Sequence, residues 1–203
     1  MQMLLAAMSA DGDSPLASLP MLTPNEQRQL IDEWGGAVAA VPGRHDPAAD
    51  VGPACIHQRF EAQAARRPDT VAVTCDAERL SYRELNERAN RLAHYLTAAG
   101  VGPETLVGIC LERSLDMVAS ILGVLKAGGA YVPLDPTYPA ERLQFMVADA
   151  RMPVVLTLAS LAERLPGGNT RCVCLDAEAE AIAACAKADP PPAAAPDSAA
   201  YVI

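Results

Sequence analysis

The sequence predicts an α/β protein: a partial, doubly wound and mostly parallel sheet with flanking helices, preceded by a helical connector. Two observations indicate this class. From residue 55 onward, short apolar runs alternate with segments of helical periodicity in the order β-α-β-α-β-α-β, which is typical of parallel strands joined by right-handed crossovers. The run from Thr105 to Cys110 is almost continuously apolar, as expected for a strand that is covered on both faces.

The first 54 residues are expected to lie outside this sheet. We interpret residues 1–22 as the end of a preceding domain, because a short apolar segment there is followed by a turn-forming run. An N-terminal capping pattern at Thr23 to Glu26 predicts a helix over residues 23–34, with Trp34 on its apolar face. Residues 35–54 have the Gly, Pro and Ala composition of a linker.

The first elements of the folded region are a helix and a hairpin. Residues 55–68 are expected to form the helix, since apolar side chains recur there at helical spacing: Ile56, Phe60 and Ala64. Alternating apolar residues over 71–75 and a turn at residues 76–78 then predict a β-hairpin, whose return strand begins at Leu80.

Ser81 and Glu84 form a second capping box, which predicts that the next helix begins at residue 82. Its apolar side chains recur on a single face: Leu85, Ala89, Leu92, Ala93 and Leu96. On the solvated face, Glu84 and Glu87 each precede an arginine, Arg88 or Arg91, by four residues. We therefore expect two ion pairs along this helix.

Ser114 caps a further helix, which is expected to be buried because apolar residues surround its axis: Met117, Val118, Ile121, Leu122, Val124 and Leu125. Gly128 and Gly129 end this helix, and residues 130–132 form a short strand. We interpret the glycine pair as a helix stop followed by close packing. A phosphate-binding turn is the alternative, but such turns precede a helix.

The remaining residues continue the alternation. We expect a helix from about residue 139, a strand at 154–158, a short helix at 160–165, a strand at 171–175, an Ala-rich helix at 176–187, a Pro/Ala/Asp linker at 188–198 and the start of a strand at 199–203.

Composition excludes several classes of protein. Hydrophobic residues make up 51% of the chain and charged residues 20%, so general disorder is excluded. The formal net charge of −9 argues against a nucleic-acid or anionic-membrane surface. The sequence contains no run of roughly 18 uncharged apolar residues and no cationic leader, so we expect no membrane association and a cytoplasmic location. The six cysteines are expected to be free thiols.

The residues alone indicate no catalytic, cofactor-binding or metal site. Cys172 and Cys174 have no second Cys or His pair at metal-ligand spacing, so we interpret them as core residues of a strand. His45 lies in the linker. His57 and His94 lie on helices, and no nucleophile follows a strand-to-helix turn that a catalytic triad would use.

Three segments together carry a resemblance to a known family. Residues 80–93 (LSYRELNERANRLA) resemble the first core motif of the amino-acid adenylation domains in nonribosomal peptide synthetases. Residues 125–136 (LKAGGAYVPLDP) resemble the second motif, and residues 200–203 (AYVI) resemble the beginning of the third. Residues 19–34 are similar to the connector between a condensation domain and an adenylation domain. The order and the spacing of the segments agree with this family.

The resemblance implies a division of the chain into three parts. Residues 1–22 would be the tail of a preceding condensation-type domain, and residues 23–54 the interdomain connector. Residues 55–203 would be the N-terminal part of an adenylation domain, incomplete at its C-terminus. The implied partners are the upstream condensation domain, the remainder of the adenylation domain and a downstream carrier domain, with no nucleic acid and no membrane.

The resemblance also implies an activity. A complete adenylation domain, an AMP-forming ligase, uses ATP and Mg²⁺ to activate an amino acid as aminoacyl-AMP, and loads it on the phosphopantetheine thiol of a carrier domain. In the family the phosphate loop follows the position of Ile203. We therefore expect no cofactor and no catalytic residue in this chain, and no activity of the chain alone. The alternatives are a fatty acyl-CoA ligase fragment of the same superfamily and a non-catalytic docking module.

Overall fold

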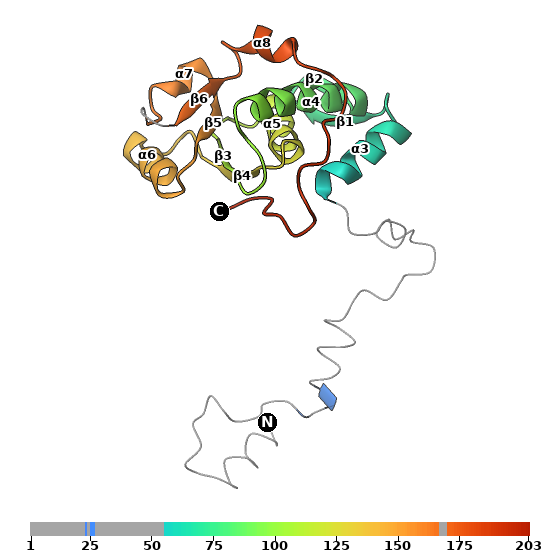
Figure 1. Cartoon of the computed structure of the whole chain (residues 1–203), viewed down its shortest axis with the longest axis horizontal. Helices are drawn as coiled ribbons and strands as arrows, with labels where there is room; N and C mark the ends of the chain where they lie inside the picture. The colour runs from blue at the N-terminus through green and yellow to red at the C-terminus, as the bar shows by residue number, and fades with distance from the viewer. Residues whose placement is uncertain (1–22, 24, 27–54, 167–169) are drawn as a thin grey trace. The chain divides into compact units, whose positions relative to one another are not determined.

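Four parallel strands form the central sheet of the computed structural model, which describes residues 23, 25–26, 55–166 and 170–203 (Figure 1). The strands are β3 (Leu106–Ile109), β4 (Ala130–Pro133), β5 (Val154–Thr157) and β6 (Arg171–Cys174). They lie in the order β4-β3-β5-β6, and every adjacent pair is parallel. The predicted α/β class with a parallel sheet is confirmed.

The segment 199–203 meets this sheet at its β4 edge. Tyr201 forms a single parallel bridge with Tyr131. The Tyr131 N–H donates to the Ala200 carbonyl and the Val202 N–H donates to the Tyr131 carbonyl, both at 3.0 Å. The start of a strand predicted at 199–203 is therefore present only as an isolated bridge beside β4.

Helices cover both faces of the sheet. They are α3 (Ile56–Arg66), α4 (Tyr82–Ala98), α5 (Leu115–Lys126), α6 (Ala140–Asp149), α7 (Ala159–Ala162) and α8 (Ala179–Ala183). On one face, Leu96 of α4 and Val124 of α5 pack against strand residues that include Leu156. On the other face, Leu143 of α6 packs against a cluster that includes Val155. Successive side chains of β5 therefore point alternately into two separate hydrophobic cores, one on each face of the sheet.

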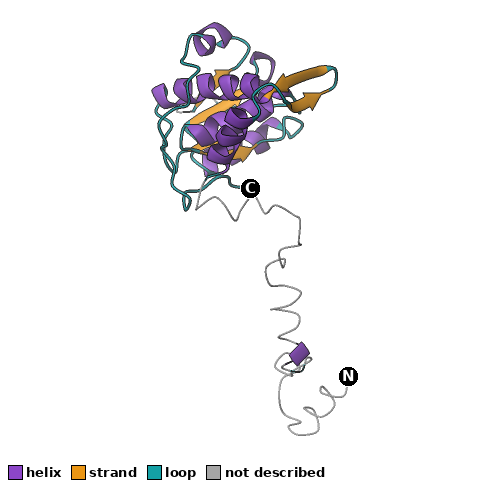
Figure 2. Cartoon of the chain, turned by 90° about the vertical axis from the view of Figure 1, so that its right-hand side faces the viewer, coloured by secondary structure: helices purple, strands orange, loops and turns teal. Residues whose placement is uncertain are grey.

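The predicted hairpin is confirmed as a separate two-stranded sheet of β1 (Val71–Cys75) and β2 (Glu78–Ser81). Figure 2 shows it projecting beside the helices. Leu80 joins a third apolar cluster with Leu85 of α4 and Leu122 of α5. The hairpin therefore extends the fold on the side of α4 and α5 that faces away from the sheet.

Helix starts follow the predicted capping residues. The Ser81 hydroxyl accepts the Glu84 N–H at 3.3 Å, and the Glu84 carboxylate accepts the Ser81 N–H at 2.8 Å. The Ser114 hydroxyl accepts the Met117 N–H at 3.2 Å. At the start of the predicted connector helix, the Glu26 carboxylate accepts the Thr23 N–H at 2.8 Å. The rest of that helix and the linker at 35–54 lie outside the described residues.

All five predicted core residues of α4 are buried, but only one of its two predicted ion pairs forms. Arg91 lies 3.5 Å from Glu87, as expected. The predicted Glu84–Arg88 pair is wrong for the described chain. The Glu84 carboxylate is occupied by the cap, and Arg88 reaches Asp116 of α5 at 3.6 Å instead.

The glycine pair after α5 ends the helix, as interpreted from the sequence. The Gly128 N–H donates to the Leu125 carbonyl at 3.1 Å, and the Gly129 N–H donates to the Val124 carbonyl at 3.0 Å. This is the Schellman pattern, and the φ angle of 89° at Gly128 explains the need for glycine there. A Cβ atom at Gly129 would lie 3.0 Å from the Thr105 carbonyl oxygen, so the expected close packing is also present.

Two expectations about the helices need correction. The Ala-rich helix predicted over 176–187 is only the five-residue α8, because residues beyond it extend to contact α4. In α3, Ile56 was expected on the buried face but is 66% exposed. His57 is buried instead of Ile56. It lies near Glu61 and Lys126, so the first turn of α3 turns a polar side chain inward, toward these charged groups.

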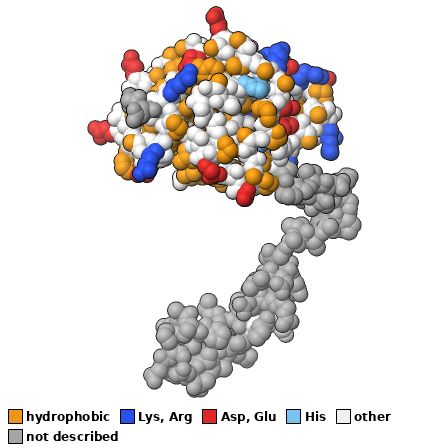
Figure 3. Space-filling view, viewed as in Figure 1, with side chains coloured by type: hydrophobic (Ala, Val, Ile, Leu, Met, Phe, Trp, Pro, Cys, Tyr) orange, Lys and Arg blue, Asp and Glu red, His pale blue; other side chains and the backbone are white. Residues whose placement is uncertain are grey.

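No helix of the described residues is long and apolar enough to cross a membrane. On the face of the molecule in Figure 3, Lys and Arg side chains are interspersed with Asp and Glu. All six cysteines are free, and Cys110 among them is buried.

Candidate functional site

The strand order places a crevice at one edge of the sheet. From β3 the chain first adds β4 on one side and then β5 on the other. In open α/β sheets, ligands bind outside the carboxyl ends of the strands, near such a reversal of order. The candidate site is therefore the region beyond Ile109 of β3 and Pro133 of β4.

A cleft of about 770 Å³ lies at this edge, and we call it the carboxyl-end cleft. The loops after β3 and β4, the start of α6 and the last residue supply its walls. Its lining residues are Ile109, Leu111, Glu112, Arg113, Met117, Val132, Pro133, Leu134, Asp135, Pro136, Thr137, Tyr138, Arg142, Met146 and Ile203.

The loop after β4 is fixed by short-range and long-range hydrogen bonds. The Asp135 carboxylate accepts the Thr137 hydroxyl at 2.7 Å and the Thr137 N–H at 2.8 Å. These two bonds hold the pKa of Asp135 below its ordinary value. The guanidinium of Arg164 donates to the Pro136 carbonyl at 2.5 Å and to the Tyr138 carbonyl at 2.7 Å. The rim of the cleft is thus preorganised.

Charges of both signs line the carboxyl-end cleft. Glu112 and Arg113 come from the loop after β3, Asp135 from the loop after β4 and Arg142 from α6. The Arg142 guanidinium stacks over the Tyr138 ring at 3.9 Å from its centroid. Among the described lining residues there is no Ser, Cys, His or Lys. The cleft is suited to holding a polar ligand.

A second hollow of about 380 Å³ lies between α4, α5 and the residues around α8. Its walls are largely apolar, and they include Leu92, Leu158 and Ile182. At this hollow Arg88 and Asp116 pair with each other. Because its position is away from the carboxyl ends of β3 and β4, it is a weaker candidate than the carboxyl-end cleft.

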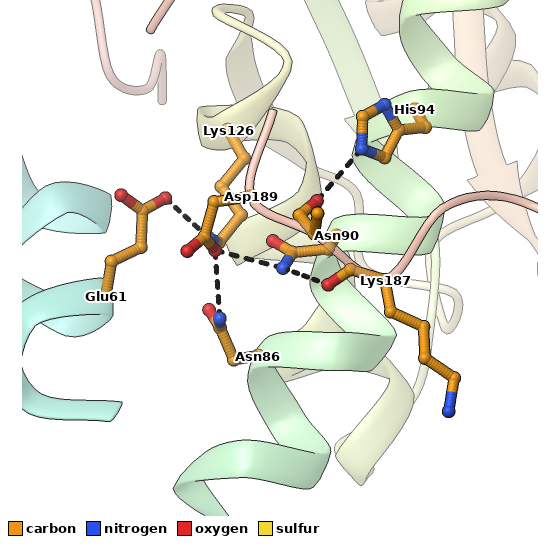
Figure 4. Close-up of polar contacts among 8 residues, drawn as sticks. Glu61, Asn86, Asn90, His94, Lys126, Lys187 and Asp189 are labelled. Atoms are coloured by element: carbon orange, nitrogen blue, oxygen red, sulfur yellow. Dashed lines mark hydrogen bonds and ion pairs between the residues drawn. The ribbon is translucent and has the colours of Figure 1, made fainter. Parts of the chain in front are cut away.

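The structure contains a polar cluster that sequence reasoning missed. The side chain of Lys126, at the end of α5, is fully buried, and its Nζ lies 2.5 Å from Glu61 Oε1 and 3.0 Å from Asp189 Oδ1. Asn86 and Asn90 of α4 each donate to the same Asp189 oxygen at 2.9 Å (Figure 4). The Lys126 cluster, these five residues, joins α3, α4, α5 and the segment after α8.

Electrostatics in the Lys126 cluster favour a charged carboxylate. Burial alone would raise the pKa of Asp189, but hydrogen bonds from Asn86, Lys126 and Asn90, together with the Lys126 charge, lower it. The one sequence signal for this cluster is the position of Lys126, a charged residue in an otherwise apolar helical turn. A lysine whose stem and head are both enclosed needs a counter-charge, but the sequence does not say which residue supplies it.

The surroundings of His57, which lies beside the Lys126 cluster, lead us to expect that stability depends on pH. Burial lowers the pKa of His57, the Lys126 charge lowers it further, and Glu61 opposes the shift. The imidazole of His57 binds a proton less readily in the folded chain than in the unfolded chain. The free energy of unfolding should therefore be at its full value above the ordinary pKa of 6.5, and should fall as the pH drops below 6.5. Urea unfolding between about pH 5.5 and 7.5 should show this slope, and His57→Gln should flatten it.

The test of this prediction has an internal control. Above about pH 7.5, the parent chain and His57→Gln should differ by a constant offset only, since the histidine is neutral in both states there. An unchanged slope below pH 6.5 in the variant would show that His57 does not carry the effect.

The sequence analysis predicts no catalytic, cofactor-binding or metal-binding residue. The structure shows where the histidines and cysteines that it considered lie. The His94 ring contacts the Ala188 carbonyl at 3.0 Å, and Cys172 and Cys174 lie on β6. Among the described residues no group of three or more His, Cys, Asp or Glu is placed to hold a metal ion. His45 lies outside the described residues.

Comparisons with known proteins give a consistent result. A subunit of the linear gramicidin synthase of Brevibacillus parabrevis is 44% identical over 200 residues, which cover 98% of this chain and 2% of the synthase subunit. The crystal structure of the nonribosomal peptide synthetase FmoA3 in its AMPPNP-bound form is 31% identical, with a TM-score of 0.74, over 98% of this chain and 21% of that chain. A fatty acyl CoA synthetase of Mycobacterium tuberculosis shares the fold, at 24% identity and a TM-score of 0.62, over 68% of this chain and 30% of that chain.

This chain spans only a few per cent of the length of the curated relatives that it matches. The sequence profile of AMP-binding enzymes matches residues 60–203, which include the whole parallel sheet and both loops of the carboxyl-end cleft. The chain therefore belongs to the family of AMP-binding enzymes.

Proposed function

We propose that these residues form the N-terminal part of an amino-acid adenylation domain of a nonribosomal peptide synthetase. The complete domain would use ATP and Mg²⁺ to activate an amino acid as aminoacyl-AMP, and would load it on the phosphopantetheine thiol of a carrier domain. The observation that carries this proposal is the 44% identity to a gramicidin synthase subunit over 98% of the chain. The family match over residues 60–203 agrees with it.

The contribution of this chain to that activity is a preorganised scaffold. The capped α4 and α5 hold the sheet, and the Asp135 and Arg164 bonds fix one rim of the carboxyl-end cleft. A triphosphate with Mg²⁺ needs several cationic and oxygen ligands together. The described cleft offers Arg113 and Arg142, of which Arg142 stacks on Tyr138, and its Asp135 is engaged by Thr137. These residues do not make a complete ATP and Mg²⁺ site, so we derive no chemical step from them.

We also propose the arrangement of the parts and their partners. Residues 1–22 would end a condensation-type domain and residues 23–54 would connect it to the adenylation domain that begins at residue 55. The remainder of the adenylation domain and a carrier domain would follow. Multidomain relatives such as a dimodular nonribosomal peptide synthase of Bacillus subtilis, which is 43% identical over 80% of this chain, support partners of this kind. Dependence on ATP and on carrier domains is consistent with action in the cytoplasm.

A fatty acyl-CoA ligase is the less supported alternative. The similarity to the fatty acyl CoA synthetase is at 24% identity and indicates the fold alone. Three different subunits of the linear gramicidin synthase are 38 to 44% identical over almost the whole chain. A docking module that kept only this fold has no specific observation in its favour.

ATP–pyrophosphate exchange tests the proposal and separates the alternatives. This chain, joined at Ile203 to the remainder of the matching adenylation domain from the 44% identical gramicidin synthase subunit, should exchange pyrophosphate in the presence of an amino acid. The same domain with its own N-terminal part is the positive control. Exchange that depends on a fatty acid would favour the ligase. A folded hybrid that exchanges with neither substrate class would contradict the proposal.

A further inference from the structure

The last part of the given chain is held most firmly near its start and near its end. We call residues 187–203 the C-terminal strap; it leaves α8, crosses α4 and ends beside β4 (Figure 1). At its start, the Lys187 carbonyl accepts the Asn90 amide at 2.7 Å, and the Asp189 carboxylate is held in the Lys126 cluster (Figure 4). At its end, Tyr201 bridges to Tyr131.

Between these attachments the strap has weaker contacts, one of which is the Cys55 thiol, 3.8 Å from the Ala194 carbonyl oxygen. A Cβ atom at Gly128 would lie 2.9 Å from the Ala193 Cβ, which shows how closely the strap follows the turn after α5. The Ala199 N–H donates to Glu104 at 3.1 Å. The strap contains no helix or strand of its own beyond the bridge. Its path therefore depends on how firmly its start is held.

The strap connects the Lys126 cluster to the carboxyl-end cleft. The Tyr131 and Tyr201 rings stack with their centroids 5.7 Å apart, and Ile203, two residues further on, lines the cleft. Movement of the strap would therefore move Ile203, a 98% exposed side chain at the rim of the cleft, and the β4 edge beside it. The distant cluster is thus connected through the strap to the β4 edge and to one rim of the cleft.

The anchor of the strap includes a cation that has no access to water, although the Asp189 side chain itself is 49% exposed. Three donors converge on the single oxygen Oδ1 of Asp189: Asn86, Asn90 and the fully buried Lys126. Hydrogen bonds to a charged group contribute more than bonds between neutral groups. By comparison, the Lys187 ammonium of the same strap pairs with Glu87 at 3.1 Å, and its side chain is 62% exposed.

We propose that Asp189 is a positioning residue: held by Lys126, Asn86 and Asn90, it fixes the C-terminal strap and thereby sets the edge of β4 and the Ile203 wall of the carboxyl-end cleft. Its effect on ATP use rests on the proposed function. Its effect on the strap does not, because it follows from the contacts of this chain alone.

Amide hydrogen exchange on the 203-residue chain tests the structural part. Asp189→Asn keeps the shape of the side chain but removes the charge. It should raise the exchange rates of the Tyr131 and Val202 amides roughly tenfold, since their bridge bonds would open with the strap. Amides of β3 and β5 should change much less. Lys187→Ala is the matched control on the same strap, and it should leave the bridge amides nearly unchanged.

Two further variants keep this test decisive if Asp189→Asn unfolds the chain. Asn86→Ala removes one donor to Asp189 and leaves Lys126 with both carboxylates, so it should give a smaller increase at the same two amides. Asp189→Glu restores a carboxylate and should recover part of the protection. Exchange of the bridge amides in Asn86→Ala that equals exchange in the parent chain would overturn the proposal, whether or not Asp189→Asn folds.

The functional part uses the hybrid domain described for pyrophosphate exchange. There, Asp189→Asn should raise the KM for ATP several-fold with a smaller change in kcat, and Asp189→Glu should reverse part of the increase, because the strap shapes the cleft without touching reacting atoms. If the hybrid is inactive, the proposed function fails while the hydrogen-exchange result still stands. An unchanged KM in a hybrid whose strap has loosened would overturn the link from the strap to the cleft.

Discussion

Removing both counter-charges of Lys126, by Glu61→Gln together with Asp189→Asn, is expected to lower the free energy of unfolding by about 3–5 kcal/mol. The Lys126 side chain is fully buried, so its ammonium would be left without a charged partner and without water. Each single variant leaves one carboxylate in place and should cost clearly less than half of the double variant. Urea unfolding near neutral pH measures all three.

The control for this prediction removes the cation instead. Lys126→Met keeps the aliphatic stem, and the carboxylates of Glu61 and Asp189 are 24% and 49% exposed, so water can solvate them. We expect a cost of about 1 kcal/mol, within the range for a lost hydrogen-bonded partner. A double variant no less stable than Lys126→Met would show that the buried ammonium does not need its counter-charges.

Leu156→Ala is expected to destabilise the chain by about 3–5 kcal/mol, the range for a large-to-small change in a tightly packed core. Leu156 lies on the central strand β5, has no exposed surface and belongs to the core between the sheet and α4 and α5. The side chain has no solvent on any side, so the cavity can close only by movement of several elements. Urea midpoints with an unchanged m value measure the effect.

Phe145→Ala is the matched control for Leu156→Ala. Phe145 lies on α6 and is 69% exposed, so its truncation should change the free energy of unfolding by less than about 0.5 kcal/mol. A similar loss in both variants would mean that the sheet core is not the main source of stability. It would contradict the placement of β5 at the centre of the fold.

Elements that depend on neighbouring residues were predictable from the sequence. The Ser81–Glu84 capping box, the buried face of α4 and the helix stop at Gly128 all follow from residues within a few positions of one another. The hairpin and the parallel strands were also predicted correctly. Alternating apolar residues indicate a strand with one covered face, and continuous apolar runs indicate a strand that is covered on both faces.

Features that depend on distant residues were not predictable. Lys126 meets Glu61 across 65 positions and Asp189 across 63, and Asn86 reaches Asp189 across 103. Residues 188–198 have the composition of a linker, which does not reveal that Asp189 near the start of this segment attaches it to α4 and α5. The carboxyl-end cleft likewise depends on the strand order, which the sequence pattern does not fix.

The most direct measurement of the central claim is amino-acid-dependent pyrophosphate exchange by the purified 203-residue chain alone, with the hybrid domain as positive control. If the chain supplies the scaffold and not the ATP site, the isolated chain should show no exchange above the no-enzyme blank, and titration calorimetry with Mg-ATP should show no binding. The hybrid should exchange under the same conditions. Clear exchange by the isolated chain would contradict the account, because it would require a catalytic site within these residues.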